Sequence, residues 1–119
     1  MNSDVGQKKI SIIIPVYNEA ESVAALHAEI VGVMKNLPNP YEVIFIDDGS
    51  TDGTFNALRV LSPVKIIRFR KNFGQTAAMA AGFDYAQGEV IVTLDGDRQN
   101  DGEGSVSYKD MRSARYNPA

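Results

Sequence analysis

The sequence of 119 residues contains no cysteine, which excludes both a disulfide framework and a thiolate metal site. This absence fits a reducing compartment, and we expect a cytoplasmic protein. No apolar stretch approaches the roughly 20 residues that cross a bilayer, and the polar start MNSDVGQKK does not resemble a signal peptide. We therefore expect any membrane association to come from segments outside this sequence.

Histidine is nearly absent too. His27 is the single histidine, and we expect it at the surface or boundary of a helix rather than in a Ser–His–Asp triad. The chain has neither a Gly-x-Gly-x-x-Gly nor a Walker loop, so bound phosphates would be held by metal rather than by a glycine cradle. The formal net charge of −3 argues against nucleic acid as a partner, because such proteins usually present a basic face.

Short apolar runs alternate with segments of helical periodicity. Near-continuous runs rich in β-branched residues indicate strands that are buried on both faces, as in a parallel sheet. Strict alternation of strand and helix predicts an α/β fold with a parallel sheet and flanking helices. We expect strands at 10–16, 42–47, 64–69 and 89–94, and the third helix at 73–87.

Capping signals suggest where the helices begin and end. Asn18 followed by Glu21 resembles a capping box and predicts the start of the first helix. Pro38 is expected to stop that helix, and Gly88 to close the helix of 73–87. The short second helix could be capped by any of three residues, Ser50, Thr51 or Asp52.

The character of the chain changes after Asp101. The segment 102–119 contains no Leu, Ile, Phe or Trp and shows no clear period. We expect it to be a flexible tail, with a polar extension at 1–8 and the folded part at 9–101. The parallel sheet would then be truncated after its fourth strand.

Polar motifs follow three of the expected strands. In open α/β sheets, ligands bind beyond the carboxyl ends of the strands. The segments 17–19 (Tyr-Asn-Glu), 47–50 (Asp-Asp-Gly-Ser) and 95–97 (Asp-Gly-Asp) all fall at such ends. The sequence therefore predicts one ligand site assembled from three separate segments.

Asp95 and Asp97 are candidate metal ligands. Carboxylate oxygens suit Mg²⁺ or Mn²⁺, and a cation with open positions can act as a Lewis acid on a diphosphate leaving group. A solvated acidic turn is the alternative explanation for this pair. Asp47, and less strongly Asp48, could accept hydrogen bonds from a base or ribose, although a turn with a helix cap also explains them.

Pro15 and Tyr17 could form a surface for a nucleobase, with Glu19 as a polar contact. The alternative is that the proline ends the strand and the tyrosine packs. Three cations after the third strand could be ordinary surface charges, or they could attract a phosphate-bearing substrate toward the site: Arg68, Arg70 and Lys71.

Taken in order, four segments resemble the N-terminal, donor-binding half of family 2 glycosyltransferases. They are SIIIPVYNEAESV, VIFIDDGSTDGT, NFGQTAAMAAGFDYAQGEVIVTLDGD and the following Gln99-Asn100-Asp101. NFGQ before an alanine-rich helix, followed by D-x-D-x-Q, looks like the polyprenyl- or dolichyl-phosphate mannosyl- and glucosyltransferases. The resemblance covers about residues 9–101.

This resemblance implies a GT-A (Rossmann-like) fold and a UDP- or GDP-sugar donor. It further implies transfer of a hexose, with inversion, to a polyprenyl or dolichyl phosphate at the cytoplasmic face of a membrane. Asp95 and Asp97 would be the catalytic pair that holds Mg²⁺ or Mn²⁺. The implied nucleotide-sugar contacts are Pro15, Tyr17, Glu19, Asp47 and Gln99, with Asp48 beside them.

The sequence departs from the family pattern at Arg98, where leucine is usual, and at Gly102, where proline is usual. No acceptor half follows Asp101, as a truncated or frameshifted product would show. We therefore expect weak donor binding and no turnover from the isolated chain. Two alternatives remain: an inactive, poorly folded product, or a non-catalytic nucleotide-binding α/β module. A phosphoacceptor receiver is disfavoured because no lysine follows a fifth buried strand.

Overall fold

The computed structural model describes residues 8–94 and the backbone of residues 112–115. Its sheet has the strand order β3-β2-β1-β4-β5. Neighbouring strands among the first four are parallel, whereas β5 runs antiparallel to β4. The strands are β1 (Ile10–Val16), β2 (Tyr41–Asp47), β3 (Lys65–Arg68), β4 (Val90–Thr93) and β5 (Arg112–Arg115). The helices are α1 (Val23–Met34), α2 (Thr54–Leu58) and α3 (Gln75–Tyr85).

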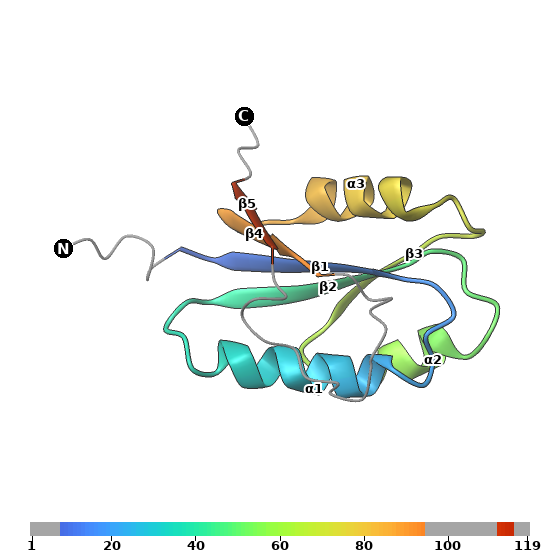
Figure 1. Cartoon of the computed structure of the whole chain (residues 1–119), viewed down its shortest axis with the longest axis horizontal. Coiled ribbons are helices and arrows are strands. Elements are labelled where there is room, and N and C mark those ends of the chain that lie inside the picture. Colours follow the sequence, from blue (N-terminus) through green and yellow to red (C-terminus); the bar gives the residue numbers. More distant parts are fainter. Residues whose placement is uncertain (1–7, 95–111, 116–119) are drawn as a thin grey trace.

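Helices cover both faces of the sheet, as Figure 1 shows: α1 and α2 lie on one face and α3 lies on the other. Alternate residues of the central strands supply the two cores, because successive side chains of a strand point to opposite faces. Ile12 and Ile14 pack with α1 and α2, whereas Ile13 packs with α3. All three isoleucines are fully buried, which confirms the α/β prediction of strands covered on both faces.

Helix α3 lies close to the sheet at Gly82. A methyl group on Gly82 would lie 2.5 Å from Ile13 Cγ2 and 3.0 Å from Ile46 Cδ1. No side chain larger than hydrogen fits there without displacing the helix. The alanine-rich sequence of α3 has the same basis, because small residues allow the helix backbone to approach β1 and β2.

Several helix boundaries differ from the sequence prediction. Helix α1 begins at Val23 rather than near Asn18, because Asn18 adopts a left-handed φ of +53° and binds the loop after β2 instead. The helix ends at Met34, before Pro38 is reached. Helix α3 ends at Tyr85, and the extended backbone of Ala86, not Gly88, terminates it.

Gly88 has a different role from the predicted helix cap. A methyl group there would lie 2.6 Å from Ser11 Oγ and 2.8 Å from Lys9 O, so the chain entering β4 passes against β1. The expected flexible tail is also wrong in part. Residues 112–115 form strand β5 on the free edge of β4, because exposed backbone groups of an edge strand accept any extended segment that reaches them.

None of the helices in the described ranges, 8–94 and 112–115, has the length and apolar character required to span a bilayer.

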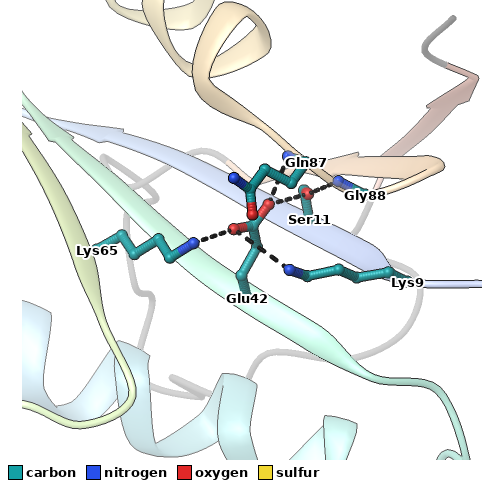
Figure 2. Close-up of polar contacts among 6 residues, drawn as sticks. All are labelled: Lys9, Ser11, Glu42, Lys65, Gln87 and Gly88. Atoms are coloured by element: carbon teal, nitrogen blue, oxygen red, sulfur yellow. Dashed lines mark hydrogen bonds and ion pairs between the residues drawn. The ribbon is translucent and has the colours of Figure 1, made fainter.

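A buried carboxylate connects three strands at the amino ends of the sheet. Figure 2 shows Glu42 of β2 at the centre of this cluster. It accepts a hydrogen bond from Ser11 of β1, one from the backbone N–H of Gln87 at 2.7 Å, and one from Lys65 Nζ of β3 at 2.8 Å. Ser11 Oγ in turn accepts from Gly88 N at 2.8 Å. The cluster thus holds β1, β2, β3 and the entry to β4 together.

Burial alone would raise the pKa of Glu42. The hydrogen bonds from Lys65, Ser11 and Gln87 oppose burial and hold the pKa of Glu42 below its ordinary value of 4.5. Hydrogen bonding to Glu42 likewise raises the pKa of Lys65. Because the folded-state pKa of Glu42 is lowered, its contribution to stability is complete above the ordinary value and is lost as pH falls through the folded-state pKa.

We predict that Glu42→Gln lowers the free energy of unfolding by about 2 kcal/mol at pH 7, because a charge-assisted hydrogen bond to Lys65 is lost. Denaturant unfolding between pH 3 and pH 7 measures this. The destabilisation should shrink toward pH 3, since protonation removes the same charge from the native protein. Glu21→Gln, at an exposed position, is the matched control. A constant difference across this range would contradict the assignment.

A second pair of variants tests the packing of α3. Gly82→Ala should destabilise the fold by about 1–3 kcal/mol, because the added methyl overpacks against Ile13 and Ile46. Gly32→Ala should stabilise it by about 0.4–1 kcal/mol, since Gly32 lies in α1 with open space around its Cα. Thermal unfolding of the two variants beside the parent measures both signs. Equal effects would show that α3 does not pack as described.

Candidate functional site

The loops that follow β1 and β2 bind each other at the carboxyl edge of the sheet. Asn18 N donates to Ser50 Oγ at 2.8 Å, and Asn18 Oδ1 accepts from Thr51 N at 2.8 Å. Glu19 N donates to Thr54 Oγ1 at 2.9 Å, which extends the contact to the start of α2. The structure therefore brings together two of the three polar segments that the sequence placed at this edge.

Asp52 organises the start of α2. Its carboxylate accepts from the backbone N–H of Thr54 at 2.9 Å, from the Thr54 hydroxyl, and from Ala20 N at 3.3 Å. The hydrogen bond from the Thr54 hydroxyl is the main reason why the pKa of Asp52 lies below its ordinary value. The N-cap of α2 is Gly53 and not one of the three predicted residues, although Asp52, one position earlier, accepts from the first backbone N–H of the helix.

Asp47 is the last residue of β2 and is 1% exposed. One carboxylate oxygen, Oδ1, accepts from Ser50 N at 3.0 Å. The other, Oδ2, is buried and has no hydrogen-bond partner within residues 8–94. A buried carboxylate oxygen without a donor is costly, so this atom is a candidate acceptor for a group on a ligand.

Asp48 holds the segment between β3 and α3. Its Oδ1 accepts from Phe73 N at 2.8 Å, and its Oδ2 accepts from Gly74 N at 3.0 Å and from Asn72 Nδ2 at 3.2 Å. Asn72 Nδ2 also donates to the Asp48 backbone carbonyl at 3.1 Å. Both oxygens of the Asp48 carboxylate are therefore engaged by the loop, unlike those of Asp47.

Gly49 allows this loop to approach. It has a left-handed φ of +72°, and a Cβ on it would lie 2.2 Å from the Lys71 carbonyl carbon and 2.4 Å from Asn72 N. Only glycine fits such a contact between two backbones without strain. The turn after β2 and the loop before α3 therefore form one packed unit.

A cavity of about 370 Å³ opens between these segments. Four of its lining residues are the predicted Pro15, Tyr17, Glu19 and Asp48. Val16 also lines it, and Val16 pairs with Asp47 in the sheet. The sequence prediction missed three lining residues of the NFGQ segment, although that segment follows a strand at the same edge: Asn72, Gly74 and Gln75.

Pro15 fits within a central strand because of its register. Asp48 N donates to Val16 O, and Leu94 N donates to Ile13 O. The backbone N–H and C=O groups of odd-numbered β1 residues therefore point toward β4, and those of even-numbered residues point toward β2. The β4 pairing ends at Ile13, opposite Thr93. Pro15 therefore lacks its N–H where no strand partner requires one, and its ring is available to the cavity.

The cations after β3 lie on the outer side of the same loop. Arg68 and Lys71 lie over aromatic rings, with Arg68 Cζ 4.0 Å from the Phe55 centroid and Lys71 Nζ 5.3 Å from that of Phe73. These cations line a second, shallower hollow and not the cavity that contains Pro15.

His27 is buried rather than at the surface, and its Nε2 lies 2.8 Å from the carbonyl oxygen of Pro63. It is a packing residue of α1. The predicted Asp95, Asp97 and Gln99 lie outside the described residues, so their place in the site remains a prediction. Within residues 8–94, no group of three or more His, Cys, Asp or Glu side chains is arranged to hold a metal ion.

Comparison with known proteins identifies the family. Residues 11–105 match the model for glycosyl transferase family 2. The dodecaprenyl-phosphate galacturonate synthase of Rhizobium johnstonii is 42% identical over 105 residues, which is 84% of this chain and 31% of the relative. An undecaprenyl-phosphate 4-deoxy-4-formamido-L-arabinose transferase of Serratia proteamaculans is 42% identical over 98 residues, or 78% of this chain and 30% of the relative. The chain thus spans about a third of the length of these relatives.

Solved structures agree with this family. A mannosyltransferase from Pyrobaculum calidifontis, in complex with GDP-Man and Mn²⁺, superposes with a TM-score of 0.63 and 26% identity over 76% of this chain and 28% of that protein. Mannosyl-3-phosphoglycerate synthase from Rubrobacter xylanophilus has a TM-score of 0.68 at 19% identity, covering 78% of this chain and 32% of that protein, and shares the fold. With a family match over most of its residues and this sheet, the chain belongs to glycosyl transferase family 2.

Proposed function

We propose that this chain is the donor-binding part of a glycosyltransferase that moves a hexose from a nucleoside diphosphate to a polyprenyl phosphate. The observation that carries the proposal is the cavity at the carboxyl edge, which is lined by the predicted Pro15, Tyr17, Glu19 and Asp48. Asp47 is not among the lining residues, but it pairs with Val16 of the lining, and its buried Oδ2 has no hydrogen-bond partner within residues 8–94. The names of the relatives from Rhizobium and Serratia support a polyprenyl-phosphate acceptor.

The nucleoside would enter between the ends of β1 and β2. Pro15 and Tyr17 offer apolar surface to a base, and Tyr17 is 44% exposed and therefore accessible. Asp47 Oδ2 would accept a hydrogen bond from a base N–H, which would satisfy its missing donor. Glu19 offers a carboxylate at the rim of the same cavity. Either uracil or guanine presents such an N–H.

Asp95 and Asp97 would hold the divalent cation. In sequence they follow β4, which is parallel to β1 and therefore ends at the edge of the sheet where the cavity lies. Two carboxylates suit Mg²⁺ or Mn²⁺, and the solved relative from Pyrobaculum contains Mn²⁺. When bound, such a cation neutralises charge on the departing diphosphate. Gln99 would contact the donor next to this pair.

The transfer would invert the anomeric centre. A phosphate oxygen of the lipid forms a bond to the anomeric carbon while the bond from that carbon to the nucleoside diphosphate breaks. An anionic phosphate nucleophile needs little help from a general base, so the reaction with this acceptor does not require one in the site. The parts that bind the acceptor would lie in the remaining length that the relatives have and this chain lacks.

We predict metal-dependent binding of UDP or GDP to this chain, measured by titration calorimetry with and without Mn²⁺. Asp47→Asn should weaken binding about 30-fold, because the amide N–H of asparagine would face the base N–H from which Asp47 Oδ2 would accept a hydrogen bond. Asp97→Ala should remove the dependence on Mn²⁺.

Asp84→Asn is the matched control for the loss of one charge, since Asp84 is exposed on α3. Binding that ignores Mn²⁺ and is unchanged by both site variants would leave a nucleotide-binding module without this chemistry. If neither UDP nor GDP binds to the folded chain, the assignment of a donor site to this part of the protein is wrong. Release of free nucleoside diphosphate from a nucleotide sugar separates turnover from binding.

A further variant tests how Asp48 contributes. Asp48→Ala removes the acceptor of three hydrogen bonds from the loop at 72–74. We expect it to weaken nucleotide binding at least tenfold and to raise hydrogen–deuterium exchange at Phe73 and Gly74, whose N–H groups would lose their acceptors. Exchange that stays slow at these two amides would contradict the positioning role, whatever happens to affinity.

A further inference from the structure

The outer side of the β3–α3 loop combines positive charge with exposed aromatic surface. Five residues form it, and we call them the cationic face: Arg68, Phe69, Arg70, Lys71 and Phe73. They line a shallow hollow of about 680 Å³. The side chains of all three cations are exposed, and the Phe73 ring is 57% exposed.

The charge of this face is uncompensated. Within residues 8–94, none of its three cations has a carboxylate partner, and the recorded ion pairs involve Glu42 at the other end of the sheet. The sequence explains why. No Asp or Glu occurs between Asp52 and Asp84, a span that contains five Lys or Arg residues, in a chain whose net charge is −3. The segment that forms this face is therefore locally basic in a chain whose net charge is negative.

Of the two aromatic rings of the cationic face, Phe73 is exposed and Phe69 is half-buried. Phe69 and Phe73 form an edge-to-face pair with centroids 5.6 Å apart, and Lys71 Nζ lies over the Phe73 ring. Phe69 packs against the core on the α3 side of the sheet, and this contact fixes the position of the aromatic pair.

A separate apolar groove lies along α3, the helix that follows this loop. It has a volume of about 470 Å³ and is lined by Gln75, Thr76, Met79, Ala80 and Phe83. Gln75 also lines the nucleotide cavity, so the beginning of α3 separates the cavity from the groove. Cations, exposed rings and an apolar groove on one side match a partner that has an anionic surface with hydrocarbon beneath it.

We infer that the cationic face docks on an anionic lipid bilayer, with Arg70 and Lys71 among the phosphate headgroups and Phe73 at the boundary of the acyl chains. Basic residues near a charged membrane surface each add to binding, and one aromatic side chain adds an apolar anchor. Such docking would hold the nucleotide cavity, on the inner side of the same loop, near the plane of the headgroups. The surface contact itself does not depend on sugar transfer.

The test is co-sedimentation of this chain with vesicles of phosphatidylcholine alone and of phosphatidylcholine mixed with phosphatidylglycerol. We expect binding to the anionic vesicles only, with an affinity that falls as salt is raised. Arg70→Gln with Lys71→Gln should lower the partition coefficient roughly 30-fold. Phe73→Ser should lower it severalfold and leave the salt dependence unchanged.

Matched controls separate this face from net charge and general hydrophobicity. Lys35→Gln with Arg59→Gln removes the same charge elsewhere, and Val60→Ser removes another exposed apolar side chain, 73% exposed in the parent. Equal losses in the control and face variants, binding to neutral vesicles, or no sedimentation at all would each overturn the inference. So would competition by inorganic phosphate at the concentration of the lipid, which would indicate a small-anion site.

Nucleotide titration of the same variants keeps the two proposals apart. Arg70→Gln with Lys71→Gln should bind UDP or GDP as the parent does, since neither side chain lines the nucleotide cavity. Loss of vesicle binding with nucleotide binding retained supports the docking surface alone. Loss of both together would assign these cations to the donor site instead and overturn the docking inference.

Discussion

The candidate site depends on the contact between Asp48 and the loop at 72–74. The two oxygens of one carboxylate accept three hydrogen bonds from this loop, and these bonds fix where α3 begins. Since Gly74 and Gln75 line the cavity, the geometry of the cavity follows from the hydrogen bonds that this one carboxylate accepts. Asp47 and Asp48 are adjacent in sequence. Both oxygens of the Asp48 carboxylate accept hydrogen bonds, whereas Oδ2 of Asp47 has no partner among residues 8–94.

A second carboxylate, Glu42, performs a comparable structural task at the opposite edge of the sheet. It joins β2 to Lys65 of β3 and to the segment that enters β4, as Figure 2 shows. Strands of a parallel sheet have no hairpin to set their relative register, because each is followed by a crossover. A buried acid at one edge and a second acid at the other supply positional constraints that the apolar core between them does not, since isoleucine against isoleucine packs at many offsets.

The sequence was sufficient to predict the four parallel strands, the helices on both faces and half of the residues that line the cavity, because buried β-branched runs and polar strand ends carry a strong local signal. It failed where a side chain binds a distant segment. Asn18 looks like a helix cap, but it binds Thr51 across 33 positions. Gly88 looks like a helix terminator, but glycine is required there because a Cβ would lie too close to Ser11. Likewise, the saturation of Asp48 by Phe73 and Gly74 is a long-range contact that no local pattern encodes. The strand at 112–115 lacks the alternation of apolar and polar residues that would have predicted it.

The close approach of Gly49 to Lys71 and Asn72 has a consequence for how such a site can diversify. There is no room for even one carbon atom between the two backbones, so any side chain at position 49 would push the loop at 71–72 away from the turn after β2. Changes of donor specificity would come from substitution of the side chains that line the cavity. Tyr17, Glu19 and Gln75 are free to vary in this sense, whereas position 49 is closed to every residue except the one it holds.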